Sequence, residues 1–237
     1  MKLKYKRILL KLSGEQLAGK FDVGIDPVVV HFLAEEIKPL AEAGCEIAIV
    51  VGGGNMVRGH KLAGEGIKRV TADHMGMLSG LMNAMATTDI FEADGISTRC
   101  LSHIFVDQVA ESYSFRRALK HLEHHRVIII AGGMARSYFS HDTGAVSMAL
   151  ELDCDVMLKA TKVGGVFDHD PVTHPGAKMF DQMTFQEAVE NKDVQVMDSA
   201  ALGLAMEQKM PMIIFNAMER GNLLKVVTGE KIGTSIS

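Results

Sequence analysis

Three consecutive glycines, Gly52-Gly53-Gly54, follow an apolar run at residues 47–51, and this junction limits the possible folds of the chain more than any other stretch. A short run rich in Ile and Val that ends at glycines is typical of a buried strand followed by a tight turn. Glycines leave the backbone N–H groups uncovered, so an anion can approach them closely. We therefore predict a phosphate-binding turn, with Asn55 as the N-cap of a following helix and Arg58 as a phosphate ligand. The alternative is an ordinary tight turn in an α/β protein.

Three other predicted strands end in a similar way. They are residues 5–12, which end in Lys11-Leu12-Ser13-Gly14, residues 127–131, which continue into Gly132-Gly133, and residues 153–160, which continue into Lys159-Ala160-Thr161-Lys162. Parallel strands place their carboxyl ends at one edge of the sheet, where open α/β sheets bind their ligands. We therefore expect all four junctions to converge on one polyanionic ligand.

Helical segments alternate with these strands. Asp26-Pro27 is a typical helix start, and apolar residues at helical spacing continue toward Gly44. Residues 71–92 predict one long Met-rich helix, placed either at a subunit interface or in the core. Further predictions are strands at 96–101 and 104–106, a helix start at Thr143 and a closing edge strand at 233–236. The alternation indicates a single α/β domain with parallel strand pairs.

Composition excludes several classes of protein. The 237 residues are 47% hydrophobic and 23% charged, as in an ordinary soluble enzyme, and the net charge of −4 disfavours non-specific binding to nucleic acid. Three scattered cysteines without a C-x-x-C motif fit a reducing cytoplasm. The chain has no apolar run approaching the roughly 20 residues of a membrane helix, so no membrane association is expected.

Two groups of residues contain side chains that commonly bind metal ions. His121, His124 and His125 have helical spacing, and residues 168–174 contain Asp and His side chains. Neither group matches a zinc-protease pattern or an EF-hand loop. We interpret both as solvated surface and predict no metal site built from protein side chains alone.

Five motifs resemble those of the amino acid kinase family, and within that family they are most similar to the bacterial uridylate kinases. They are Lys11-Leu-Ser-Gly14, Gly52-Gly-Gly-Asn55-x-x-Arg58-Gly59, Asp73-His-Met-Gly-Met77, Lys159-Ala-Thr-Lys162 with Gly165-Val-Phe-Asp-x-Asp170-Pro171, and Val196-Met-Asp198. The resemblance implies a three-layer αβα sandwich with a central, mainly parallel sheet. It also implies an acceptor-binding N-terminal lobe at about 1–150 and an ATP-binding C-terminal lobe at about 151–237.

The activity implied by this resemblance is transfer of the ATP γ-phosphoryl group to UMP, with Mg²⁺ accompanying ATP, in pyrimidine nucleotide biosynthesis. Residues implied to contact ATP are Lys11, Leu12, Ser13, Gly14, Gly54, Arg58, Thr161, Phe167 and Asp170. Residues implied to contact UMP are Gly53, Asp73, Met134, Ala135, Arg136, Ser137, Tyr138, Phe139, Ser140 and His141. Catalytic roles are implied for Lys11, Lys162, Asp142 and Arg58.

The acceptor loop departs from the family pattern Thr-Gly-Asn-Pro-Phe-Phe-Thr-Thr-Asp, because this chain has Met134-Ala-Arg-Ser-Tyr-Phe-Ser-His-Asp142. The resemblance further implies a homohexamer that GTP activates and UTP inhibits. Arg99 and Arg126 match the family's effector site, whereas Glu92 and Phe115 replace its usual His and Trp.

The residues themselves are compatible with this chemistry. A phosphate acceptor with a second pKa of about 6 is largely a dianion at pH 7, so the reaction needs no general base. It needs positioning and neutralisation of two crowded phosphates, which Lys11, Lys162 and Arg58 provide. We expect Asp142 to orient the lysines rather than to accept a proton.

Two other interpretations remain open from the sequence. One is a kinase of the same family that acts on a carboxylate or carbamate acceptor. The other is a non-catalytic nucleotide sensor with the same fold.

Overall fold

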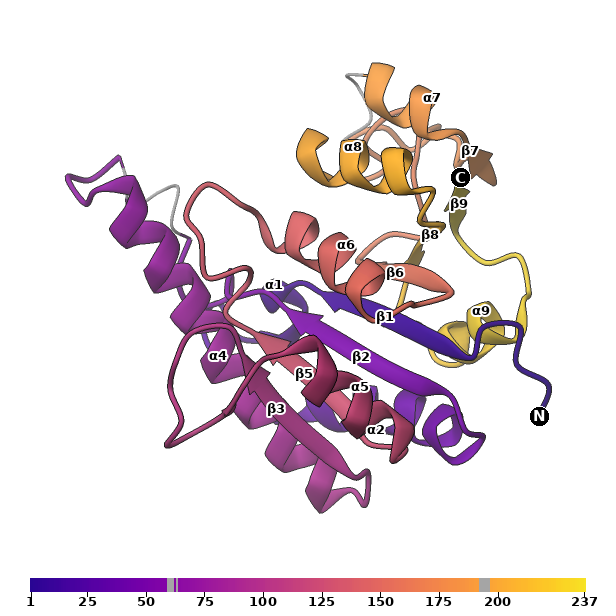
Figure 1. The fold of residues 1–237 in the computed structure, drawn as a ribbon. Helices are drawn as coiled ribbons and strands as arrows, with labels where there is room; N and C mark the ends of the chain where they lie inside the picture. The colour runs from indigo at the N-terminus through magenta and orange to yellow at the C-terminus, as the bar shows by residue number, and fades with distance from the viewer. Residues whose placement is uncertain (59–61, 63, 192–196) are drawn as a thin grey trace.

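The computed structural model describes all residues except 59–61, 63 and 192–196, so Gly59 and Val196 of the motifs lie outside the described residues. A central sheet has the strand order β4-β3-β5-β2-β1-β6-β8-β9-β7, with helices on both faces (Figure 1). Its strands are β1 Arg7–Leu12, β2 Glu46–Val51, β3 Thr98–Ser102, β4 Glu111–Ser112, β5 Val127–Ala131, β6 Val156–Thr161, β7 Gln182–Met183, β8 Met212–Asn216 and β9 Thr234–Ile236.

Neighbouring strands run parallel, except for the antiparallel pair β8 and β9. The predicted αβα sandwich with a mainly parallel sheet is therefore confirmed. The labelled helices are α1 Gly14–Leu17, α2 Pro27–Glu42, α4 Arg69–Ala93, α5 Phe115–Glu123, α6 His141–Glu151, α7 Phe185–Glu190, α8 Ser199–Gln208 and α9 Asn222–Thr228.

Alternating apolar side chains divide the core between the two faces of the sheet. In β1, Ile8, Leu10 and Leu12 pack with α2, α4 and α9 on one face. Leu9 packs on the opposite face with α5, α6, α7 and α8. This period-two alternation also decides which face each polar strand residue points to.

Several sequence predictions are confirmed at the level of single residues. The Asp26 carboxylate accepts a hydrogen bond from the Val28 N–H at 3.1 Å, as expected of an N-cap, and Pro27 opens α2. The long helix predicted at 71–92 is α4. The described residues contain no helix that is both long and apolar enough to cross a membrane.

Other boundaries were predicted wrongly. Residues 104–106 are not a strand, because the Ser102 hydroxyl bonds both the N–H and the carbonyl of Ile104 in a local turn. The last strand, β9, is not at the sheet edge, since β7 pairs with its outer side. Helix α6 begins at His141, two residues before the predicted start, because Ser140 caps it.

Candidate functional site

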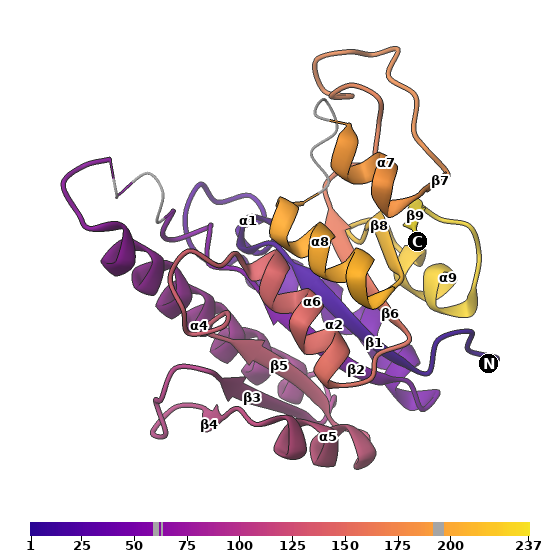
Figure 2. The same ribbon diagram turned by 45° about the horizontal axis from the view of Figure 1, so that its top comes forward.

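The four predicted junctions lie side by side. Strands β5, β2, β1 and β6 are consecutive neighbours in the sheet and run parallel, so their carboxyl ends meet at one edge. The predicted convergence of these four strand ends is therefore confirmed. Helix α6 covers this edge and packs beside α8 on the same face (Figures 1 and 2).

Strand register brings two lysines together at this edge. Lys11 of β1 and Lys159 of β6 are direct partners across the parallel pair, so their side chains point to the same face. Leu9 and Met157, two residues earlier on each strand, belong to the core beneath α6. Both lysines therefore point toward the start of α6.

Asp142, in the first turn of α6, joins these two lysines. Its Oδ1 lies 2.6 Å from the Lys11 Nζ, and its Oδ2 lies 2.7 Å from the Lys159 Nζ. All three side chains are only 11–13% exposed. Burial opposes ionisation of Asp142, but the two ammonium groups overcome it and lower the pKa of this carboxyl to about 2. The cluster has one carboxylate that faces two lysines, and the charge of the nearby Asp198 also acts on Lys159.

The sequence placed Lys159 in one of the four strand-end junctions but did not assign it a catalytic or binding role of its own. Its pKa is lowered by burial and by Lys11, while Asp142 opposes that shift. The sequence did contain a signal for this role, since Lys159 occupies an inward-facing position of a strand that is otherwise apolar. Burying an unpaired ammonium group is costly, so such a lysine is expected to have a charged partner. Lys162, the predicted partner of Lys11, is exposed and is not ion-paired with any described side chain.

The glycines of the site have two different roles. A Cβ on Gly14 would lie 2.6 Å from the Gly52 carbonyl oxygen, and one on Gly53 would lie 2.4 Å from the Gly76 carbonyl oxygen. These two glycines therefore allow backbone to pack on backbone. A Cβ on Gly54 would meet the Glu15 Cγ only at 3.7 Å, an ordinary contact. Gly54 thus leaves its open side to a ligand.

Asn55 is not a helix N-cap, contrary to the prediction. Residues 54–56 form a turn, and the buried Asn55 amide exchanges two hydrogen bonds with Asn83 of α4, at 2.9 and 2.7 Å. Asn83 also donates to the Gly52 carbonyl at 2.7 Å. The glycine turn is therefore fixed to α4 by buried amides, whose hydrogen bonds are costly to break.

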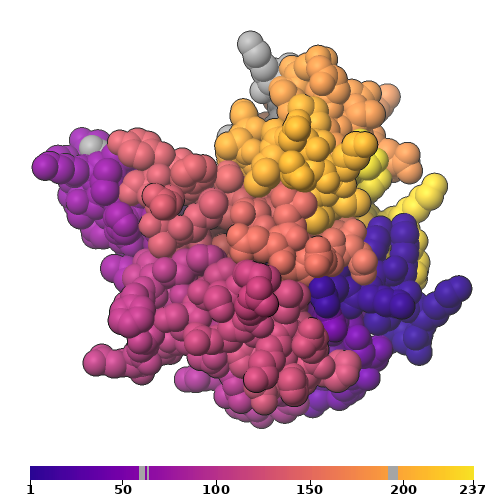
Figure 3. Space-filling model, viewed as in Figure 1, coloured from indigo at the N-terminus to yellow at the C-terminus, as the bar shows by residue number. Residues whose placement is uncertain are grey.

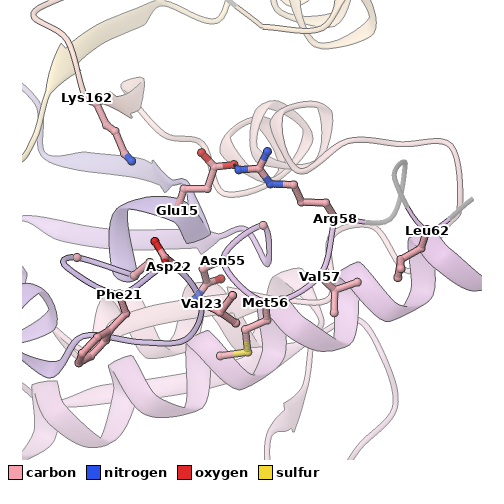
Figure 4. Close-up of a pocket in the computed structure, with 13 residues that line it drawn as sticks. Glu15, Phe21, Asp22, Val23, Asn55, Met56, Val57, Arg58, Leu62 and Lys162 are labelled. Atoms are coloured by element: carbon pink, nitrogen blue, oxygen red, sulfur yellow. Dashed lines mark ion pairs between the residues drawn. The ribbon is translucent and has the colours of Figure 1, made fainter. Parts of the chain in front are cut away.

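Arg58 and Lys162 line a pocket of about 660 Å³ beside the glycine turn (Figure 4). The Arg58 guanidinium lies 2.5 Å from the Glu15 carboxylate, and both side chains are 44% exposed. Such an exposed ion pair contributes little stability, so a ligand phosphate can compete for the guanidinium. Figure 4 shows Lys162 projecting toward the same pocket.

A second pocket, of about 480 Å³, separates the glycine turn from the loop at residues 134–140. Asp73 of α4 fixes this loop, since its carboxylate accepts hydrogen bonds from the Tyr138 N–H at 2.9 Å and from Arg69 at 2.7 Å. Figure 3 shows the surface notched between this region and the C-terminal helices. The pocket is lined by Glu15, Gly53, Gly54, Val57, Arg58, Arg69, Ala72, Asp73, Gly76, Met77, Tyr138, Phe139, Ser140, His141 and Asp198.

The loop is held in uncommon backbone conformations. Ala135 and Tyr138 have φ values of 52° and 69°, in the left-handed region that residues other than glycine seldom adopt. Tyr138 and Phe139 are 70% and 48% exposed. Aromatic rings exposed at the rim of a pocket are suited to contact a planar ligand group.

The remaining residues predicted to contact the adenine nucleotide lie at the end of β6 and in the segment after it. The Thr161 hydroxyl is occupied by the carbonyls of Val163 and Phe215, at 2.7 and 3.1 Å. Phe167 forms an isolated bridge with Met179, and Asp170 is exposed. The structure therefore places Thr161 at the end of the strand that carries Lys159, and Phe167 and Asp170 in the segment that follows it.

The described residues contain no group of three or more His, Cys, Asp or Glu side chains arranged to hold a metal ion. The prediction that His121 belongs to a solvated helix face is wrong. It is 8% exposed and lies between the Glu111 carboxylate, at 3.1 Å, and Arg126, at 3.1 Å.

His141 lies at the base of the second pocket. Its Nε2 is buried and has no hydrogen-bond partner among the described residues, and a Cβ on Gly80 would approach that atom to 3.4 Å. Burial and the nearby Lys11 lower the pKa of this imidazole to about 4, although Asp142 opposes the shift. The side chain is therefore neutral at pH 7.

His141 is expected to make folding stability sensitive to mild acid. Its pKa is lower in the folded chain than the ordinary 6.5, so the unfolded chain binds more protons and stability falls as pH drops from 6.5 toward 4. By linkage, the loss is at most about 3 kcal/mol. We expect thermal melts between pH 7 and 4 to show a shallower decline for His141→Thr than for the wild type.

Part of the slope should persist in every protein, because burial also lowers the pKa of His103. Equal slopes for His141→Thr and the wild type would contradict the assignment.

Comparisons with known proteins identify the family of this chain. A model of the amino acid kinase family matches residues 6–216. A uridylate kinase from Xanthomonas oryzae pv. oryzae is 46% identical over 234 residues, which cover 99% of this chain and 97% of that protein.

Solved structures of UMP kinases are also similar to this chain. A UMP kinase from Bacillus anthracis superposes with a TM-score of 0.94 at 35% identity, over 98% of this chain and 96% of that one. A UMP kinase from Ureaplasma parvum gives 0.91 at 30% identity, over 99% of this chain and 100% of that one.

Proposed function

Because the chain belongs to the amino acid kinase family and, within it, to the uridylate kinases, we propose that it transfers the γ-phosphoryl group of ATP to UMP, producing UDP and ADP for pyrimidine nucleotide synthesis. The observation that carries this proposal is the cluster of Lys11, Asp142 and Lys159 at the carboxyl ends of β1 and β6. The cluster lies beside the glycine turn and the second pocket, where two phosphates can meet.

The acceptor occupies the second pocket in this proposal. Its phosphate faces Gly53, and its ribose and base lie against Asp73 and the loop at 134–141, within an N-terminal lobe at about 1–150. Because the Asp73 carboxylate already accepts two hydrogen bonds, UMP must share or displace them. The exposed Tyr138 and Phe139 rings supply apolar contact to the uracil.

ATP binds on the other side of the glycine turn in this proposal. Lys11, residues 12–14, Gly54 and Arg58 hold its phosphates. Thr161, Phe167 and Asp170 line the adenine nucleotide in the C-terminal lobe at about 151–237. Arg58 is available to both nucleotides because it borders both pockets.

Catalysis in this arrangement rests on positioning and charge. The acceptor phosphate is largely a dianion at pH 7 and needs no base to remove a proton. Lys11, Lys159 and Lys162 neutralise the charge that spreads over the oxygens of the transferring group. Asp142 holds Lys11 and Lys159 at fixed positions, and a carboxyl with a pKa of about 2 remains ionised throughout the reaction.

Mg²⁺ enters the site with ATP in this proposal. Asp142 is occupied by two lysines, and Glu15 lies against Arg58, so the nearby carboxylates are already engaged. The ATP phosphate oxygens and water would then hold Mg²⁺, which usually keeps several water ligands, and the ion would supply further neutralisation of phosphate charge.

We also propose that the protein is a cytoplasmic homohexamer that GTP activates and UTP inhibits. Leu78 and Met82 on α4 are 44% and 56% exposed, which supports a subunit contact along this helix. At the expected effector site, Arg99 already lies 2.7 Å from Glu92. A GTP phosphate has to compete with that carboxylate, which weakens GTP activation.

An acceptor panel tests the proposed function. With ATP and Mg²⁺, we expect the purified protein to phosphorylate UMP with a higher kcat/KM than CMP, because the exocyclic amine of cytosine donates a hydrogen bond where uracil O4 accepts one. Acetylglutamate, aspartate and carbamate should give no turnover. Equal or better use of any of these three acceptors would overturn the assignment to UMP.

A further inference from the structure

Asp198, the last residue of the Val-Met-Asp motif, makes more contacts than a helix cap requires. It caps α8 through the Ala201 N–H, which donates to its Oδ1 at 3.0 Å. The same oxygen accepts from the Thr143 hydroxyl of α6 at 2.9 Å, and Oδ2 accepts from the Ser140 hydroxyl. Both carboxylate oxygens therefore bind the beginning of a second helix.

Ser140 connects Asp198 to the cluster of Lys11, Asp142 and Lys159. Its hydroxyl oxygen accepts the N–H groups of Asp142 and Thr143, each at 3.0 Å, and so fixes the first turn of α6. Asp142 in turn bridges Lys11 and Lys159. A continuous set of hydrogen bonds and ion pairs thus leads from α8 to the two lysines.

Two other caps among the described helices, Thr184 and Asp26, bond groups that lie close to them in the sequence. Thr184 caps α7 through a capping box with Glu187, entirely within its own helix. Asp26 accepts from the nearby N–H groups of Val28 and Lys20. Asp198 instead bonds Thr143 and Ser140, which lie 55 and 58 positions earlier in the chain, and it also lines the second pocket. Helix capping alone does not explain these contacts.

We propose that Asp198 is a positioning residue for phosphoryl transfer, holding Ser140 and the first turn of α6 so that Asp142 stays between Lys11 and Lys159. This inference rests on the proposed function. In this proposal Asp198 acts through its hydrogen bond with Ser140 rather than as a ligand of the reacting phosphates. A misplacement of about 1 Å in a catalytic group can cost about 10²-fold in rate, so loss of this tether affects kcat.

The test combines Asp198→Asn, Ser140→Ala and the double variant. Asn retains an oxygen that caps α8, but its NH₂ group cannot accept from the Ser140 hydroxyl. We expect each single variant to lower kcat about 10-fold with the KM for ATP within about 2-fold. The double variant should be no slower than the slower single variant, because both changes break the same connection.

Two further variants separate positioning from general stability. Ser140→Thr keeps the hydroxyl and should restore kcat to within about 2-fold of the wild type. Thr184→Ala removes a cap remote from the site, so it should lower the Tm while leaving kcat unchanged. A kcat within 2-fold of the wild type for folded Asp198→Asn, or losses that multiply in the double variant, would overturn the proposal.

Hydrogen exchange provides a measurement that does not depend on activity. The Asp142 and Thr143 amides should exchange about 10-fold faster in Asp198→Asn and Ser140→Ala than in the wild type and Thr184→Ala. Unchanged exchange would refute the tether even if the wild type fails to phosphorylate UMP. A wild type inactive toward UMP with the expected exchange pattern would refute the proposed function alone.

Discussion

Lys11→Ala is expected to lower kcat for UMP phosphorylation by about 10³-fold or more. A single preorganised donor at a developing anion is commonly worth 10²–10³-fold, and Lys11 additionally balances the buried charge of Asp142. The side chain is 11% exposed and is covered by α6, so water cannot replace the ammonium efficiently. Steady-state kcat measured at saturating ATP and UMP, with circular dichroism to verify folding, provides the measurement.

Two variants calibrate this result. Lys159→Met should lose activity by a similar factor, because Asp142 binds both lysines at nearly equal distances. Lys20→Ala, which removes an exposed lysine in the turn after α1, should have wild-type kcat. If folded Lys11→Ala kept more than a tenth of wild-type kcat, the two-lysine cluster would not be the site of transfer.

Gly54→Ala is expected to lower kcat/KM by about 10²-fold while leaving the Tm within about 2 °C of the wild type. The new methyl group meets the Glu15 Cγ at 3.7 Å, which is an ordinary contact, so the fold accepts it. The methyl group does occupy the space in which we place the ATP phosphates. Close backbone approach is lost there, and with it the N–H contacts to the anion.

Gly53→Ala is the matched variant with the opposite expectation for stability. Its Cβ would lie 2.4 Å from the Gly76 carbonyl oxygen and 2.7 Å from the Gly80 nitrogen, so α4 has to move. We expect a fall in Tm of several degrees or loss of soluble protein, as overpacking against backbone usually produces. Normal activity in Gly54→Ala would exclude this turn from the phosphate site.

Sequence periodicity was sufficient to predict the central architecture. The apolar runs at β1, β2, β5 and β6 and the helices between them predicted parallel neighbours, and hence four strand ends at one edge. These features are local, since strand length, alternation and glycine punctuation are determined within a few residues. The two-residue strands β4 and β7 have no such pattern, so the sheet edges were predicted wrongly.

The candidate site was predictable only where its residues belong to a local motif. Lys11 and Gly54 lie at strand-end junctions that the sequence shows directly, whereas Asp142 was implied by the family resemblance. The partnership of Lys159 with Lys11 depends on strand register, which links residues 148 positions apart. The pairing of Asn55 with Asn83 and the role of Asp198 depend on tertiary contacts between separate elements, which propensity and spacing do not determine.

Single-turnover transfer from γ-³²P-labelled ATP tests the central claim most directly. The enzyme is in excess over ATP, and UMP is present. We expect the label to appear in the β-phosphate of UDP within a single catalytic cycle of the wild type. In Lys11→Ala the same transfer should be about 10³-fold slower. Label released as inorganic phosphate, or retained in ATP by the folded wild-type protein, would contradict transfer to UMP at the site formed by Lys11, Asp142 and Lys159.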